Sequence, residues 1–116
     1  MAQYEHLPIF KDSYDFMIDL YKYISNFPKE YKYSLWEKLK NYSLDIVIWI
    51  YEINSEMNKW IKKGIFFQVI KLLEKCKILV RISKDIKILS LDVFIKLSNK
   101  NINILKQLEW WKRSII

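Results

Sequence analysis

Apolar residues recur every three or four positions along most of the chain, which is the spacing of one face of an α-helix. The first such segment runs from Pro8 to Ile24, with its apolar residues at Phe10, Tyr14, Met17, Leu20, Tyr21 and Ile24. A second segment runs from about Lys29 to Asn54, with its stripe at Leu35, Leu39, Tyr42, Ile46, Trp49 or Ile50, and Ile53. A third carries Ile65, Val69, Leu72, Cys76, Leu79 and Ser83, and its pattern fades near Ile88. A fourth runs to about Arg113. The pattern predicts four amphipathic helices.

Residues that start or stop helices separate these segments. Pro8 suits a first helical turn, and the residue before Pro28 disfavours helical angles. Ser90 is a favourable N-cap, with Asp92 in the following turn. The break before the third helix lies within 54–64. One Gly and two Pro are too few for the turns of an all-β fold. We therefore predict one all-α domain over residues 1–116, an antiparallel up-down four-helix bundle.

The third helix presents more than one surface. At about 100° per residue, Phe67, Ile78 and Ile82 fall nearly opposite its core stripe. Apolar residues make up 52% of this short chain, so some large side chains must lie on the surface. A monomeric bundle has no need of a second apolar strip. We expect these three residues to contact a neighbouring subunit.

Positive charge is the most distinctive feature of the composition. Twenty Lys and Arg stand against thirteen Asp and Glu, so the net charge is +7, which favours anionic partners such as nucleic acid. On the third helix Lys77, Arg81 and Lys84 form one basic stripe. The alternative for this stripe is a solvated face, with Arg81 weakly neutralised by Asp85.

A second basic region surrounds the start of the second helix. Here Lys29, Lys32, Lys38 and Lys40 alternate with Tyr31, Tyr33 and Trp36. Such rings can stack on bases of single strands, or they can fasten the helix to its neighbours. We expect Tyr33, Leu35 and Leu39 mainly to pack, with the lysines facing outward toward nucleic acid.

The residues offer little support for catalysis. His6 is the only histidine, Cys76 falls on the core face, and no Gly-rich phosphate loop is present. Asp15 and Asp19 have the spacing of a carboxylate metal site, but no Glu-x-x-His sequence accompanies them. We expect no catalytic residue, no metal and no cofactor. Without a signal peptide, a membrane span or a second cysteine, we expect a cytoplasmic protein.

Three stretches carry a resemblance to a known family. LPIFKDSYDFMIDLYKYISNFPKEYKYSLWEKL, Leu7 to Leu39, resembles the start of the Avd family, the accessory variability determinants of diversity-generating retroelements. LVRISKDIKILSLDVF, Leu79 to Phe94, and LKQLEWWKRS, Leu105 to Ser114, resemble later family segments. Trp36 stands where the family usually has Gly, and Glu109-Trp110 stands where it often has Gly-Gly.

The resemblance implies a four-helix bundle that assembles into a ring-like homopentamer. It implies binding of RNA and DNA through a basic surface, and partnership with a reverse transcriptase in mutagenic cDNA synthesis from a template RNA. The matching basic positions are Lys29, Lys32, Lys38, Arg81 and Lys84. The alternative is a related branch, the four-helix proteins encoded in intervening sequences of bacterial 23S ribosomal RNA genes. In that case the protein is an oligomeric protein-interaction module without a direct nucleic-acid role.

Overall fold

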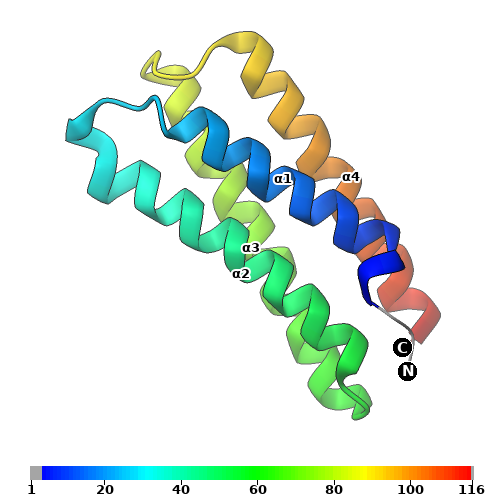
Figure 1. Ribbon diagram of the computed structural model, residues 1–116. Helices are drawn as coiled ribbons and strands as arrows, with labels where there is room; N and C mark the ends of the chain where they lie inside the picture. Colours follow the sequence, from blue (N-terminus) through cyan, green and yellow to red (C-terminus); the bar gives the residue numbers. More distant parts are fainter. Residues whose placement is uncertain (1–3, 116) are drawn as a thin grey trace.

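Four antiparallel helices form the molecule, and each lies beside the next in sequence while the first also lies beside the last (Figure 1). The computed structural model describes residues 4–115. The helices are α1 (Pro8–Ile24), α2 (Glu37–Ser55), α3 (Lys59–Asp85) and α4 (Leu91–Ile115). The short connections place the α1–α2 and α3–α4 turns at one end of the bundle. The predicted four-helix bundle is confirmed.

The start of the second helix differs from what the sequence predicts. In place of a continuous α-helix from Lys29, the chain forms a 3-10 turn (Lys29–Tyr31) and then a π-helical turn (Lys32–Trp36). The N–H of Glu37 donates to the carbonyl of Lys32, five residues back, and α2 follows directly. Phe27 is buried and anchors the α1–α2 turn in the core. Such wide turns are rare in proteins as a whole, and those that do occur are often found at functional sites.

Side chains cap two of the helices. At α3, Asn58 Oδ1 accepts the N–H groups of Trp60 (2.9 Å) and Ile61 (3.2 Å). At α4, Ser90 Oγ accepts the N–H of Val93 at 3.2 Å, so the predicted N-cap is confirmed. Both caps satisfy backbone donors that the first helical turn leaves without partners.

The end of α3 contains the single strained backbone position of residues 4–115. Lys87 has φ of 68°, in the left-handed region that favours glycine. The N–H of Ile88 donates to the carbonyl of Ser83 (3.0 Å), and that of Lys87 donates to the carbonyl of Lys84 (3.0 Å). This pair of bonds is the Schellman ending of a helix.

We expect Lys87→Gly to stabilise the protein by about 0.5–1 kcal/mol. Glycine removes a left-handed penalty of roughly 1 kcal/mol, and its greater freedom in the unfolded chain offsets part of that gain. Urea denaturation followed by circular dichroism measures the change. Lys87→Ala is the matched control, because it removes the same charge and keeps a Cβ. Equal stability of the two variants would show that the backbone at Lys87 carries no strain.

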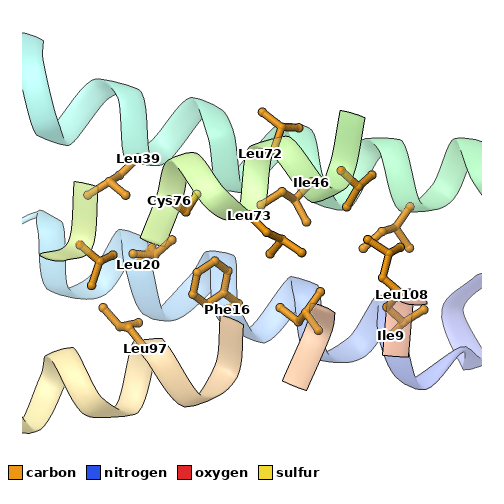
Figure 2. Packing of buried hydrophobic residues seen from close by; sticks show 14 of the residues in the cluster. Ile9, Phe16, Leu20, Leu39, Ile46, Leu72, Leu73, Cys76, Leu97 and Leu108 are labelled. Atoms are coloured by element: carbon orange, nitrogen blue, oxygen red, sulfur yellow. The ribbon is translucent and has the colours of Figure 1, made fainter. Parts of the chain in front are cut away.

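The core lies on the axis of the bundle, and all four helices contribute to it (Figure 2). Phe16, Leu39, Leu73 and Leu97 point into this interior from α1, α2, α3 and α4. The sequence left open whether Trp49 or Ile50 belongs to the apolar stripe of α2. The structure shows that it is Ile50, which is fully buried, whereas Trp49 is exposed. Tyr14 was predicted in the core stripe of the first helix, and this is wrong. It lies on the outer side of α1, where its ring stacks beside Phe10.

Cys76 belongs to this core, as its position on the apolar stripe predicted. Its side chain is fully buried, and burial raises the pKa of the thiol to about 12. The thiol therefore stays protonated and acts as a small apolar side chain.

A polar seam joins α1 to α4. Asp12 accepts hydrogen bonds from Asn103 (3.0 Å) and Gln107 (2.6 Å), and Asp19 pairs with Lys100. Lys96 Nζ donates to the Tyr23 hydroxyl at 3.2 Å, and this bond, together with the nearby Asp19 carboxylate, raises the pKa of Lys96. This seam gives the α1–α4 contact a fixed register.

Within residues 4–115, no helix is long and apolar enough to cross a membrane.

Candidate nucleic-acid interface

Most of the net positive charge lies at one end of the bundle, where the α1–α2 and α3–α4 turns meet (Figure 1). We call this the basic end and define it as residues 20–40 and 80–98. It holds nine Lys or Arg and four Asp or Glu, so it carries five of the seven net positive charges. The up-down topology brings these two sequence-distant stretches together. A concentrated field of this kind attracts polyanions.

The first group of predicted contacts surrounds the π-helical turn. Lys29, Lys32 and Lys38 are all exposed, as the sequence predicted for side chains that face outward. Among the described residues, no carboxylate lies within 4 Å of the amino groups of Lys29 or Lys38. These two lysines therefore present their full charge to solvent.

The second group lies on α3 and is not uniform. Arg81 is exposed and lies 3.8 Å from Asp85, so the ion pair expected from the sequence is present but loose. Lys77 is exposed at the edge of a small cavity of about 30 Å³ that Phe16 and Leu97 also line. Lys84 is half-buried, lies 3.4 Å from Asp85 and covers the ring of Phe94 at 4.5 Å. Of the three, Lys84 is the least free to meet a phosphate.

Lys38 and Lys84 lie on different sides of α3. Lys38 lies one helical turn before Tyr42, whose ring is covered by Lys75 of α3, so Lys38 faces the α2–α3 side. Lys84 reaches α4 through Phe94, so its stripe faces the α3–α4 side. The predicted basic residues therefore do not form one continuous cluster, and Lys77 lies just outside the basic end.

The expectation that Tyr33 packs is wrong. Its ring is 77% exposed, whereas Leu35 and Leu39 are buried as predicted. A residue two positions before a buried one lies nearly opposite it on a helical turn, and the π-helical turn keeps this relation. The segment therefore projects one ring outward among the lysines.

The predicted oligomer strip lies outside the core of the single chain. Phe67, Ile78 and Ile82 are 51%, 55% and 40% exposed on the outer face of α3. Whether a neighbouring subunit covers them stays a prediction.

Further exposed apolar side chains were missed. They are Tyr14 and Ile18 on α1 and Leu44, Ile48 and Tyr51 on the adjacent α2. The signal was present in the i, i+4 spacing of Leu44 and Ile48, outside the core stripe of α2.

Carboxylates are scattered rather than gathered. Asp15 is exposed, whereas Asp19 is engaged by Lys100 of the α1–α4 seam. Across residues 4–115, no three His, Cys, Asp or Glu side chains gather closely enough to hold a metal ion.

The sequence was compared with models of known protein families and with curated proteins, and neither comparison gives a match. The fold itself defines the class of the protein, an all-α domain of four helices packed as a bundle.

Proposed function

We propose that this protein is a non-enzymatic nucleic-acid-binding protein that contacts RNA or DNA phosphates through its basic end. The observation that carries the proposal is the concentration of five of the seven net positive charges at one end of the bundle. Lys29 and Lys38 there have no carboxylate within 4 Å among residues 4–115. Exposed cations without acidic partners are the side chains that bind phosphate groups of nucleic acids.

The resemblance to the Avd family supports a narrower form of this proposal. In that form the protein assists a reverse transcriptase and its template RNA during mutagenic cDNA synthesis, as a homopentamer. The exposed strip of Phe67, Ile78 and Ile82 supplies an apolar surface for assembly. Assembly would bring several basic ends onto one particle and would strengthen its attraction to a polyanion.

The alternative, an oligomeric protein-interaction module, draws on the same exposed apolar side chains. It predicts assembly without affinity for nucleic acid. The two proposals therefore differ in one measurable property, which is binding of RNA or DNA at physiological salt.

Salt dependence tests the proposal. The dissociation constants for a labelled single-stranded RNA and for a DNA duplex are measured by fluorescence anisotropy from about 50 mM to about 200 mM salt. We expect log–log slopes of about −0.7 per contacted phosphate for the single strand and about −0.9 for the duplex. Absence of binding at about 50 mM salt, or affinity that does not change with salt, would contradict the proposal.

A further inference from the structure

Rings and lysines alternate in a ladder at the basic end. Lys32 Nζ lies 5.5 Å from the centre of the Tyr33 ring and 5.4 Å from that of Trp36. Lys40 Nζ lies 5.3 Å from the centre of the Trp36 ring and 5.4 Å from that of Tyr21 on α1. Each ammonium thus bridges two rings within the range of cation–π attraction. We call these five residues the cation–ring ladder.

The ladder ends in solvent. Tyr21 and Trp36 are half-buried, whereas Tyr33 at the far end is 77% exposed. Three of the five residues, Lys32, Tyr33 and Trp36, lie within the wide π-helical turn. Tyr33 is therefore a ring held against a neighbour on one side and open on the other. An exposed aromatic ring of this kind is a favourable surface on which a flat partner can stack.

The surroundings of Tyr33 identify that partner as an anion that carries a flat ring. Lys29 and Lys32 stand four residues and one residue before Tyr33, and both are exposed. Glu30 and Glu37 are the acidic side chains of this segment, and neither forms an ion pair with its lysines among the described residues. A nucleotide supplies both chemistries, because its base stacks and its phosphate pairs with an ammonium group.

We propose that Tyr33 stacks on an unpaired base of single-stranded nucleic acid while Lys29 and Lys32 hold the neighbouring phosphates. This inference rests on the proposed nucleic-acid function and assigns its substrate class. In a duplex the base faces are covered by neighbouring pairs, so Tyr33 has no partner there. The protein therefore prefers single strands over duplexes at its basic end.

A second exposed ring with lysines beside it lies elsewhere on the molecule. Trp60 is also highly exposed, and the amino group of Lys63 lies 5.7 Å from the centre of its ring. It sits at the start of α3, beside the α2–α3 turn and away from the basic end (Figure 1). Because Lys59 directly precedes Trp60, this ring also has lysines on both sides in the sequence, and it is therefore a matched control for an exposed ring with neighbouring lysines outside the basic end.

The experiment compares four proteins on two labelled probes, a twelve-nucleotide oligo-uridine and a DNA duplex of twelve base pairs. We expect Tyr33→Ala to weaken single-strand binding by about 5- to 150-fold and to leave duplex binding unchanged. Tyr33→Phe keeps the ring and should bind like the unmodified protein, as should Trp60→Ala. The salt slope of Tyr33→Ala should stay unchanged, because stacking releases no counterions. Circular dichroism confirms that each variant is folded.

Each other outcome has a separate meaning. If Tyr33→Ala leaves single-strand affinity unchanged, or lowers affinity for both probes equally, the stacking inference is wrong and the proposed function stands. If the unmodified protein binds neither probe at low salt, the proposed function itself fails, and the stacking inference fails with it.

Discussion

Replacing Phe66 by alanine should lower the free energy of unfolding by about 3–5 kcal/mol. Phe66 is fully buried on α3, and its ring and the Trp111 ring of α4 form a T-shaped pair with 5.4 Å between their centres. The substitution removes this contact and leaves a cavity between the two helices. Small domains have a total stability of about 5–15 kcal/mol, so the variant should unfold at a much lower urea concentration.

Phe67 provides a control of the same residue type at the next position. Its side chain is 51% exposed, and the ammonium of Lys112 lies 5.2 Å from the centre of its ring. We expect Phe67→Ala to cost under about 1 kcal/mol in the isolated chain. Urea denaturation at low protein concentration measures both variants. Equal costs would contradict the packing described for α3. A cost for Phe67→Ala that grows with protein concentration would show that Phe67 lies in a subunit interface.

The second large effect concerns binding. Replacing Lys29, Lys38 and Arg81 together by alanine should weaken affinity for RNA about 10- to 100-fold at low salt. Each exposed charge pair contributes roughly 0.5–1 kcal/mol, and three are removed. The log–log salt slope for a single strand should become shallower by about 2, because three phosphate contacts are lost. The loss should be similar for all sequences, since phosphate contacts carry no base information.

A second triple variant separates the effect of where the cations lie from the effect of the total net charge. Lys59, Lys106 and Arg113 are also exposed, lie away from the basic end, and are again two lysines and one arginine. Their replacement by alanine changes the net charge by the same amount. We expect it to lower RNA affinity much less, because those groups are farther from the bound strand. Equal losses for the two triple variants would mean that binding follows total charge and that no interface exists at the basic end.

The sequence was sufficient for the parts of the fold that depend on local pattern. Apolar spacing located four helices, Ser90 was recognised as a cap, and Pro28 was recognised as marking the break between the first two helices. These features depend on residues within one or two turns of each other, so a single sequence contains the information. The short connections then require antiparallel neighbours.

Features that depend on partners from other helices could not be predicted. The π-helical turn at Lys32–Trp36 has no sequence signature, and the aromatic positions there fit either face of a helix. Tyr14 has the spacing of a core residue, but the α1 surface facing the core is defined by Phe16, Leu20 and Ile24 instead. Aromatic side chains fit both core and surface, so periodicity alone does not place them.

The sequence indicated which residues form the candidate interface, but it did not indicate how their side chains are arranged. The topology brings Lys29, Lys38 and Arg81 to one end, and this follows from the predicted bundle. The engagement of Lys84 with Phe94, and of Lys32 with both Tyr33 and Trp36, depends on side-chain contacts that spacing does not determine.

We propose that the protein binds nucleic acid through the exposed cations of its basic end, and the narrower form of this proposal adds that the protein assembles. Light-scattering mass after size exclusion, with and without a short single-stranded RNA at about 50 mM and about 200 mM salt, tests both parts together. We predict a mass of several chains in both salts, five if the narrower proposal holds. We also predict that the particle gains mass with RNA at low salt and loses most of that gain at high salt. A single chain whose mass does not change with RNA would contradict the account.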